Sequence, residues 1–336
     1  MNNLNKTPKH LNYPNINTLL IHEKGLLKNG FFFIEESKKY LFVIDENVYK
    51  LHQNIFVNLS NNVIIYLFNA CEENKSFEEY NNILNTLFEN DFSKNDYIVS
   101  IGGGITSDLS LFVSSTYQRG MNIVLIPTTL LSMVDASIGG KCGINYQGFK
   151  NQVGSFYFPN MIIIDDEFLD TLPETQFKCG FSEIIKYGLL FDEEMIYSIE
   201  NKSYFLEVLI DKCIDHKMNT IKDDFYDNSK RKLLNFGHTY GHILESAYNY
   251  SLSHGHAVAI GMYKEIKDKE LREKVYNLLK EYFDLDYKLD EETIKKYITK
   301  DKKRNSNTVD VVLLEKIGKA RIITKKVEEI VNEYIW

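Results

Sequence analysis

Short apolar runs alternate with helical stretches in the first half of the chain, and this alternation constrains the fold more than any other feature. Strand-like runs occupy residues 40–45, 62–68, 96–102, 122–127 and 161–165, and helical patterns follow the first two at 46–56 and 76–90. This order predicts a parallel sheet covered by helices. Such sheets bind ligands at the carboxyl ends of their strands, so the loops after these runs are the first candidates for a site.

The pattern changes near residue 168. Helical periodicity then dominates, over 174–191, 203–222, 229–248, 270–284 and 290–299, with one expected hairpin at 308–315 and 320–325. At 336 residues the chain is also long for a single hydrophobic core. We therefore predict an α/β domain over 1–167 and a mostly α-helical domain over 168–336.

The chain is acidic, with 39 Lys and Arg against 47 Asp and Glu and a formal net charge of −8. Because an acidic protein is a poor ligand for nucleic acid, we expect no nucleic-acid partner. The first residues lack an apolar core and no apolar run approaches bilayer length, so we expect no secretory signal and no membrane partner. The cysteines (Cys71, Cys142, Cys179 and Cys213) include no CxxC pair, which favours reduced thiols and a cytoplasmic protein.

A glycine-rich loop follows the third strand, where GGGITSD at 102–108 leads into a helix. Glycines let the backbone approach a ligand closely, and the free N–H groups of a helix N-terminus suit an anion. The pattern matches neither GxGxxG nor a Walker loop, so alone it indicates a phosphate or a dinucleotide. A tight strand–helix turn is the alternative interpretation. Thr128 and Thr129 follow the fourth strand and could bond the same ligand.

Polar residues recur in the glycine-rich segment 126–159, among them Asp135, Lys141, Lys150 and Asn151. Loops that carry both glycines and lysines are common where a phosphate is held. A solvated surface loop with ordinary lysines is the alternative interpretation. The semi-buried run LLSMVDASIGG within the segment disfavours that alternative.

Histidines gather in the stretch 231–256. His238 and His242 are four residues apart and share a helical face, and His254 precedes Gly255, where a chain can turn sharply. Two histidines on a helix and one on a turn could bind a divalent metal such as zinc. Ordinary polar or helix-end histidines are the alternative for a bare HxxxH.

Glu183 could supply the carboxylate that this metal site needs. It lies three residues before Lys186, on one face of the otherwise apolar helix 179–190. A partly buried ion pair is the other interpretation, and this segment alone favours the two equally. With both histidines and Glu183, the set would have three ligands and open coordination, as in a catalytic zinc site.

Further polar side chains accompany the histidines. Arg231 and Asn235 precede them at spacings that extend one helical face, so Arg231, Asn235, His238 and His242 are predicted to form one continuous stripe. Polar stripes are usually solvated faces. Lys217 lies on the expected 203–222 helix.

The order and the residues of these motifs resemble those of the 3-dehydroquinate synthase family. The similarity extends from about residue 40 to 320, through GGGITSD, RGMNIVLIPTTLLSMVDASIGGKCGIN, FKNQVGSF, FSEIIK, RKLLNFGHTYGH, HGHAVAIGM and DKK. It implies a Rossmann-like first domain that binds NAD, a helical second domain that binds metal and substrate, and a homodimer. It also implies the sugar phosphate cyclase superfamily and a distant relation to iron-dependent and glycerol-type alcohol dehydrogenases.

The resemblance assigns roles to residues. It implies zinc or cobalt ligands at Glu183, His238 and His254, and it gives His242 to the substrate instead of the metal. NAD is expected along Asp45, Asn47, Glu72, Lys75, Gly104, Ile105, Thr106, Ser107, Asp108, Thr128, Thr129, Lys141, Lys150, Phe168, Leu169, Asp170 and Thr171. The expected catalytic and substrate residues are Arg119, Asp135, Lys141, Lys150, Asn151, Lys186, Lys217, Arg231, Asn235, His242 and one of Lys302 and Lys303, with Arg119 reaching a neighbouring subunit.

The implied reaction accounts for these residue types. The family converts 3-deoxy-D-arabino-heptulosonate 7-phosphate, which carries a carboxylate and a phosphate, to 3-dehydroquinate and phosphate in the shikimate pathway. The cations would form a positive well in an acidic protein. NAD is expected to oxidise the C5 hydroxyl and to be regenerated after phosphate leaves, while the metal polarises that hydroxyl. The enzyme would be a phosphate-eliminating carbon–oxygen lyase.

Several positions depart from the family pattern. His256 stands where the family usually has glutamate, and it could support a metal ligand, compete with the ligands for the metal, or have no effect. Phe225 and Asp227 replace acidic residues ahead of Arg231, and Phe149 stands in the Gly-Lys-Asn motif. The segment GMYKEIKDKELREK at 261–274 lacks the longer apolar helix that is usual there, so the second domain is expected to be trimmed.

Three other functions are compatible with the motifs. Another sugar phosphate cyclase, such as 2-deoxy-scyllo-inosose synthase, would act on a substrate without a carboxylate, and Lys217 and Arg231 disfavour it. A simple metal- and NAD-dependent alcohol dehydrogenase would not need to bind a substrate phosphate. Lys141, Lys150 and Lys186 indicate a phosphate-binding site and therefore disfavour it. A catalytically impaired relative is the third.

Overall fold

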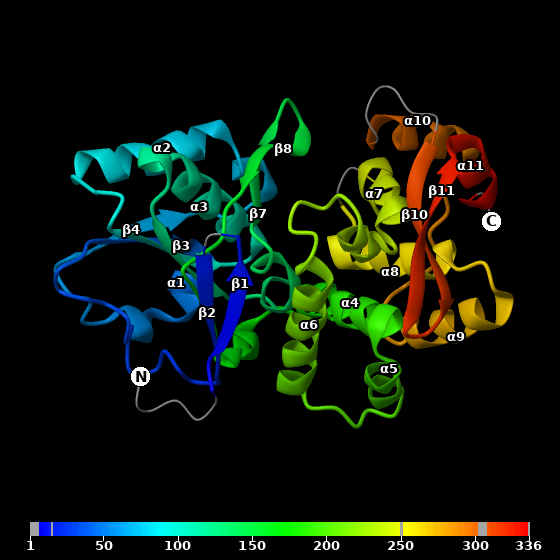
Figure 1. Ribbon diagram of the computed structural model, residues 1–336, viewed down its shortest axis with the longest axis horizontal. Helices are drawn as coiled ribbons and strands as arrows, with labels where there is room; N and C mark the ends of the chain where they lie inside the picture. The colour runs from blue at the N-terminus through cyan, green and yellow to red at the C-terminus, as the bar shows by residue number, and fades with distance from the viewer. Residues whose placement is uncertain (1–6, 15, 249–250, 302–307, 335–336) are drawn as a thin grey trace. The chain divides into compact units, whose positions relative to one another are not determined.

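The computed structural model describes residues 7–14, 16–248, 251–301 and 308–334 (Figure 1). The chain divides into two compact units, Met1–Pro173 and Glu174–Trp336. The turn η5 (Asp166–Thr171) therefore belongs to the first unit, whereas the sequence places the domain boundary after residue 167. Within the described ranges, every helix is too short or too polar to cross a membrane.

The first unit is built on a seven-stranded sheet with the order β1-β2-β9-β6-β5-β3-β4. Its strands are β1 (Lys9–Tyr13), β2 (Ile16–His22), β3 (Tyr40–Asp45), β4 (Val63–Phe68), β5 (Tyr97–Gly102), β6 (Asn122–Pro127) and β9 (Met161–Ile164). Only the pair β1–β2 is antiparallel within this sheet. The five predicted strands and the α/β class are confirmed, and β1 and β2 are additions that the sequence analysis missed.

The topology of the sheet marks one place for a ligand. The chain leaves β3 on one side to form β4 and then returns to the other side to form β5. The carboxyl ends of β3 and β5 therefore flank the point where the strand order reverses, and open α/β sheets bind ligands there. Helix α3 (Gly104–Thr116) starts directly after β5 and packs against β3, β5 and β6, with α2 (Phe77–Glu89) beside it in Figure 1.

The segment 126–159, expected as a glycine-rich loop, is largely ordered secondary structure. It contains the π-helical turn η4 (Ser132–Ala136) and a hairpin of β7 (Lys141–Tyr146) and β8 (Phe149–Phe156). Gly154 allows the two strands to pair closely, since a Cβ at this position would lie 2.1 Å from the carbonyl oxygen of Cys142. Short elements complete the first unit: α1 (Glu46–Leu51), η1 (Gln53–Phe56), η2 (Glu72–Asn74) and η3 (Tyr117–Arg119).

The second unit is helical, as predicted, with one hairpin of β10 (Thr308–Lys316) and β11 (Lys319–Lys326). Its helices are α4 (Glu174–Phe191), α5 (Glu193–Glu200), α6 (Leu206–Ile221), η6 (Lys230–Asn235), α7 (His238–Ala247), α8 (His254–Glu265), α9 (Lys269–Leu279), α10 (Glu291–Asp301) and α11 (Val327–Tyr334). The sequence analysis missed α5, α8 and α11. Residues 261–265 of the segment expected to be trimmed form the end of α8.

The predicted helix 229–248 is wrong in its middle. It is split into η6 and α7 by Gly237, whose φ of 76° lies in the left-handed region. The main chain there lies against α8, and a Cβ on Gly261 would be only 1.9 Å from the carbonyl oxygen of Gly237. The single stripe expected from Arg231 to His242 therefore does not exist, because its first two members precede the break and its last two follow it.

Glycines also bring α4, α7 and α8 together. A Cβ on Gly241 of α7 would lie 3.1 Å from the carbonyl oxygen of Ala257 of α8, and one on Gly255 of α8 would lie 2.2 Å from that of Cys179 of α4. Side chains at these two positions would hold the helices apart. The close packing sets the spacing of the polar side chains described next.

Candidate active site

Glu183 is the centre of the candidate site in the second unit. It lies in the middle of α4, is 0% exposed, and forms an ion pair through Oε2 with Nζ of Lys186. Within the described chain neither carboxylate oxygen accepts a hydrogen bond of good geometry. A buried carboxylate with so little hydrogen bonding is costly unless cations compensate it. Lys186 provides one such charge and is itself only 1% exposed.

His238 faces this carboxylate from the first turn of α7. Its Nε2 lies 3.7 Å from Oε1 of Glu183, and its Nδ1 lies 3.0 Å from the carbonyl oxygen of Phe236. A carbonyl can only accept, so Nδ1 carries the proton and the Nε2 lone pair points to Glu183. Burial, followed by the nearby charge of Lys186, holds the pKa of His238 well below its ordinary value. The neutral ring is the form that binds a metal.

His254 faces the same oxygen from the start of α8. Its Nε2 lies 3.9 Å from Oε1 of Glu183, and its Nδ1 lies 3.4 Å from Oε2 of Glu245. Burial lowers the pKa of His254, but the hydrogen bond and charge of Glu245 outweigh it, so the net shift is upward. The residue was expected on a turn, and it is instead the first residue of a helix, packed by Gly255 against α4.

The set Glu183, His238 and His254 fits a divalent metal. One atom from each of these residues lies within 4.8 Å of the others. Bonds of about 2.1 Å at a tetrahedral angle require ligand atoms about 3.4 Å apart. The Nε2-to-oxygen distances of 3.7 and 3.9 Å are slightly longer, which a small side-chain adjustment would correct. Two imidazoles and a carboxylate are also the ligands of many catalytic zinc sites with an open fourth position.

A second set overlaps the first. His242, Glu245 and His254 also present one atom each within 4.8 Å. The His242 ring centroid lies 5.5 Å from that of His238 and 6.2 Å from that of His254. His242 is thus near the first set without belonging to it.

Three expected substrate residues lie on other elements of this unit. Lys217 of α6 and Arg231 of η6 are 4% and 3% exposed, and their helices pack together. Asn235, at the end of η6, is exposed. Asp224 fixes the loop before Arg231 because its carboxylate accepts from the backbone N–H groups of Asn228, Ser229 and Arg231 at 2.7–2.9 Å. Lys217 and Arg231 are thus two buried cations of this unit, and Nη1 of Arg231 donates to the carbonyl oxygen of Phe225.

His256 belongs to neither candidate metal set among the described residues. Its Nε2 bonds to the carbonyl oxygen of Asp284, and its ring contacts Phe283 and Tyr287 at centroid distances of 5.4 and 5.3 Å. Although it is only two residues after His254, it packs against the segment between α9 and α10. The position that departs from the family pattern therefore has a packing role here.

In the first unit, expected NAD residues follow the central strands. Asp45 ends β3 and caps α1 by accepting from the N–H of Asn47 at 2.8 Å, and burial raises the pKa of Asp45. Lys75 is 3% exposed and reaches Asp108 of α3 at 2.8 Å, with Glu72 3.9 Å away. These contacts tie the loops after β4 and β5 together at the carboxyl edge of the sheet.

The loop after β5 offers hydrogen-bond donors that suit an anion. The N-cap of α3 is Gly103, so no capping side chain satisfies the N–H groups of Gly104 and Ile105. The hydroxyls of Thr106 and Ser107 are buried without a hydrogen-bond partner in the described chain. Thr128 and Thr129 follow β6 beside this loop: the N–H of Thr128 donates to the carbonyl oxygen of Gly102 at 2.9 Å, and a Cβ on Gly103 would lie 3.1 Å from Cγ2 of Thr129. Unused donors around a glycine loop fit an anionic ligand.

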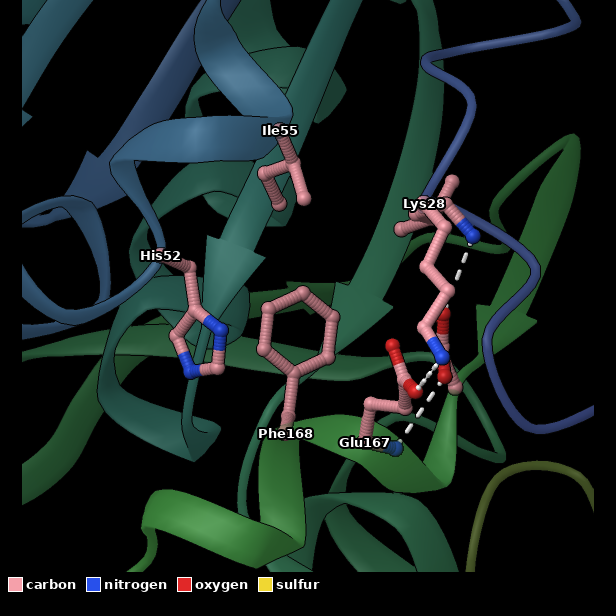
Figure 2. Close-up of a pocket in the computed structure, with 7 residues that line it drawn as sticks. Lys28, His52, Ile55, Glu167 and Phe168 are labelled. Atoms are coloured by element: carbon pink, nitrogen blue, oxygen red, sulfur yellow. Dashed lines mark hydrogen bonds and ion pairs between the residues drawn. The ribbon is translucent and has the colours of Figure 1, made fainter.

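The last expected NAD segment, Phe168, Leu169, Asp170 and Thr171, lies in η5 after β9 and borders a small pocket (Figure 2). Figure 2 shows His52 and Phe168 side by side, at a ring-centroid distance of 4.9 Å. His52 Nε2 also lies 2.8 Å from Oγ1 of Thr171, and burial lowers the pKa of His52. Lys28 pairs with Glu167 at 2.5 Å, and both side chains line the pocket. The loops after β3 and β9 are thus joined at the carboxyl edge.

The remaining expected residues of the first unit are more exposed. Lys141 and Asn151 are exposed on the β7–β8 hairpin, and Lys150 is partly exposed there. Asp135 lies in η4, and Arg119 lies in the turn η3 with a φ of 67°. Lys302 and Lys303 lie outside the described residues.

Two acidic residues near the histidines were missed by the sequence analysis. Glu245 lies three residues after His242, a spacing that places it on the same helical face and could have identified it. Glu265 is 8% exposed and accepts from the N–H groups of Gly237 at 2.8 Å and Tyr240 at 3.0 Å, so it caps the helix that begins with His238. No local pattern reveals this role, because the cap comes from another helix.

Two solved structures are similar to this chain in fold. A solved structure of 2-deoxy-scyllo-inosose synthase, complexed with carbaglucose-6-phosphate, NAD+ and Co2+, is similar with a TM-score of 0.85 and 23% identity, covering 98% of this chain and 99% of that one. The structure of 2-epi-5-epi-valiolone synthase from Streptomyces hygroscopicus subsp. jinggangensis 5008, with NAD+ and Zn2+ bound, gives a TM-score of 0.81 at 22% identity and covers 96% and 97%. The chain has the fold of these sugar phosphate cyclases.

Sequence relatives narrow the class to one family. Residues 65–179 match the family profile described as 3-dehydroquinate synthase N-terminal, and residues 180–304 match the one described as 3-dehydroquinate synthase C-terminal. The 3-dehydroquinate synthase of Clostridium tetani (strain Massachusetts / E88) is 37% identical over 329 residues, covering 89% of this chain and 87% of that protein. The chain belongs to the 3-dehydroquinate synthase family.

Proposed function

We propose that the protein converts 3-deoxy-D-arabino-heptulosonate 7-phosphate to 3-dehydroquinate and phosphate, as a lyase that depends on NAD and on zinc or cobalt. The observation that carries the proposal is the buried Glu183 carboxylate, which two histidine Nε2 atoms and Nζ of Lys186 approach together. A metal set and a cation at one carboxylate suit a substrate that offers hydroxyls beside an anionic group. The choice of this particular reaction rests on the similarity to 3-dehydroquinate synthases.

Glu183, His238 and His254 would hold the metal, which when bound polarises the hydroxyl to be oxidised. The chain contributes the orientation of the ligands. The carbonyl oxygen of Phe236 accepts the Nδ1–H of His238, so this histidine presents its Nε2. Lys186 neutralises the second oxygen of Glu183 and can donate to a bound phosphate.

Lys217 and Arg231 would bind the anionic ends of the substrate. Both are almost fully buried, so a carboxylate or phosphate that they hold is shielded from water and bound more strongly. Arg231 presents a planar fork that matches a carboxylate, and Asp224 fixes its main chain. Asn235 and His242, which are more exposed, are proposed to contact the substrate, together with one of Lys302 and Lys303.

In the first unit, we assign the carboxyl edge of the sheet to NAD, which would accept a hydride from the substrate and return it. The N–H groups at the start of α3 and the hydroxyls of Thr106 and Ser107 would bind the pyrophosphate. The other proposed NAD contacts are Asp45, Asn47, Glu72, Lys75, Asp108, Thr128, Thr129, Lys141, Lys150 and the segment 168–171. Asp135, Lys141, Lys150 and Asn151 are proposed substrate contacts.

A homodimer and a cytoplasmic location complete the proposal. Arg119 is assigned to the neighbouring subunit's site, so dilution below the dimer dissociation constant should lower specific activity. Light scattering measures the mass directly, and a monomer with full activity would refute the dimer. None of the four cysteines, all of which lie in the described ranges, forms a disulfide, as suits a reducing compartment.

Phosphate release tests the function. Purified protein supplied with NAD and zinc or cobalt should release phosphate from the heptulosonate phosphate and form dehydroquinate. Chelation should abolish the reaction, and added metal should restore it. Turnover of glucose 6-phosphate in its place would assign the chain to another cyclase, such as a 2-deoxy-scyllo-inosose synthase. Failure with both substrates would identify a catalytically impaired relative.

A further inference from the structure

His254 is shared by two overlapping candidate metal sets, and its two nitrogens face different carboxylates. Its Nε2 lies 3.9 Å from Oε1 of Glu183, while its Nδ1 lies 3.4 Å from Oε2 of Glu245. A neutral imidazole has one lone pair and one N–H. The location of a bound cation therefore depends on which of the two carboxylates accepts a hydrogen bond from the N–H of His254.

The surroundings of the two carboxylates differ. Glu183 is 0% exposed and its oxygens lack hydrogen bonds within the described chain, whereas Glu245, at 5% exposed, has the Nδ1 of His254 as a hydrogen-bond partner. A second lone pair also converges on Glu183, since the Nδ1 proton of His238 is taken by a backbone carbonyl. The Glu183 side can thus offer three ligand atoms while Glu245 accepts a hydrogen bond from Nδ1–H of His254.

We propose that Glu245 is a positioning residue: it holds the Nδ1–H of His254 and thereby directs the cation to Glu183, His238 and His254 and away from the overlapping set of His242, Glu245 and His254. The inference rests on the proposed metal role of Glu183. A carboxylate behind a metal-bound histidine fixes the ring orientation and tautomer and raises the basicity of the ligand.

Helix packing holds Glu245 in place for this role. Glu245 lies on α7 and His254 opens α8, and the two helices approach closely at Gly241, where a Cβ would lie 3.1 Å from the carbonyl oxygen of Ala257. His238 is one of the two histidine ligands, and it lies seven residues before Glu245 on the same helix. The ligand and the positioning carboxylate are thus parts of one packed pair of helices.

The test is a Co2+ titration of the metal-free full-length protein, followed by equilibrium dialysis and by the visible absorption of bound Co2+. Glu245→Ala should weaken Co2+ binding by about 10- to 100-fold and change the absorption spectrum, the range found when such outer partners are removed. Glu245→Gln, whose amide oxygen can still accept from Nδ1, should retain more of the affinity and the wild-type spectrum. Glu270→Ala, which removes an exposed glutamate from α9, is the charge control and should bind as wild type.

Two further variants separate the sets. His238→Ala should lose the wild-type Co2+ spectrum and His242→Ala should keep it. The opposite result would place the cation on the overlapping set and overturn the inference. An unchanged dissociation constant for Glu245→Ala, even with a lower melting temperature of the metal-free protein, would also overturn it, because it would show a purely structural role.

Binding and activity fail independently in this design. If the wild type binds Co2+ as expected but releases no phosphate from the heptulosonate phosphate, the proposed function fails and the role of Glu245 stands. If phosphate is released while Glu245→Ala binds Co2+ as wild type, the inference alone fails.

Discussion

The two units position their candidate residues by different physical means. In the first unit they follow the carboxyl ends of parallel strands, where the topology of the sheet brings separate loops together and backbone N–H groups provide donors. In the second unit they are charged side chains buried between helices that glycines bring into close contact, with Glu183, Lys186 and Arg231 at 0%, 1% and 3% exposure. The stability of a site on a strand edge should depend little on any one side chain. The stability of a buried charge cluster should depend on each of its members.

The largest expected effect comes from Glu183→Ala. The change leaves Lys186 buried without its partner, and breaking a buried pair in this way costs about 3–5 kcal/mol. Urea unfolding of the metal-free protein measures the loss, and a Co2+ titration should show that metal binding disappears.

The same helix offers a matched control. Glu174 pairs with Lys178 at 2.7 Å on the exposed side of α4, where water screens the pair, so Glu174→Ala should lower the free energy of unfolding far less than Glu183→Ala does. Equal losses for the two variants would show that burial does not distinguish the pairs, and the contrast between the two units would lose its basis.

The second prediction concerns backbone approach. Gly261→Ala places a Cβ 1.9 Å from the carbonyl oxygen of Gly237, where only backbone could yield, so we expect a loss of about 3 kcal/mol with weaker Co2+ binding. In the first unit, Gly104→Ala meets only the Cβ of Ala136 at 3.3 Å. It should change stability by less than about 1 kcal/mol while weakening NAD binding.

Melting temperatures and titrations of both ligands measure this pair of variants. Wild-type stability of Gly261→Ala would mean that α7 and α8 separate easily. The account of how His238 and His254 are held would then be wrong.

The contrast between the units also explains how far the sequence could predict the structure. The strands β3, β5 and β6 were identified within one residue of their ends, because a buried parallel strand is a short continuous apolar run. The α/β class and the helical second unit followed from the same local patterns. Helix 174–191 matched its observed bounds, since its periodicity is long and uninterrupted.

Tertiary contacts decided what the sequence analysis missed. The periodicity of 229–248 is that of one helix, and only the approach of α8 to Gly237 shows why it breaks. His254 was expected on a turn because a following glycine signals one, whereas Gly255 instead permits contact with α4. The remote cap from Glu265 and the direction of the His256 ring depend on segments distant in sequence, so local patterns contain no signal for them.

The third prediction compares two carboxylates, one in each unit, that accept hydrogen bonds from two backbone N–H groups. Asp165 in the first unit, 2% exposed, accepts from the N–H groups of Gly25 and Leu27 at 2.7 and 3.0 Å, much as Glu265 does in the second. Alanine at either position removes the acceptor of two N–H groups that are buried or partly buried, and should cost about 1–3 kcal/mol.

The ligands should separate these two variants. Glu265→Ala should weaken Co2+ binding because it loosens the first turn of α7, and Asp165→Ala should weaken NAD binding because it loosens the loop beside η5. Calorimetric titration of each ligand measures both effects. If either variant weakened both ligands equally, the two sites would not be separately supported, and the division of the chain into independent ligand-binding units would need revision.

The smallest expected effect is a dependence of stability on pH that arises from Asp224. Burial alone would raise the pKa of its carboxyl, but the backbone N–H groups of Asn228, Arg231 and Ser229 outweigh this and lower it from 3.8 to about 2. Because the folded-state pKa is the lower one, the stabilisation is complete only from about pH 5 upward and is lost progressively as the pH falls through 2. We expect this contribution to be about 1–2 kcal/mol.

Asp224→Asn should remove it, so the difference in unfolding free energy between wild type and variant should shrink as the pH is lowered from 5 to 2. A difference that stays constant over this range would show that the loop before Arg231 is held by contacts other than the Asp224 charge.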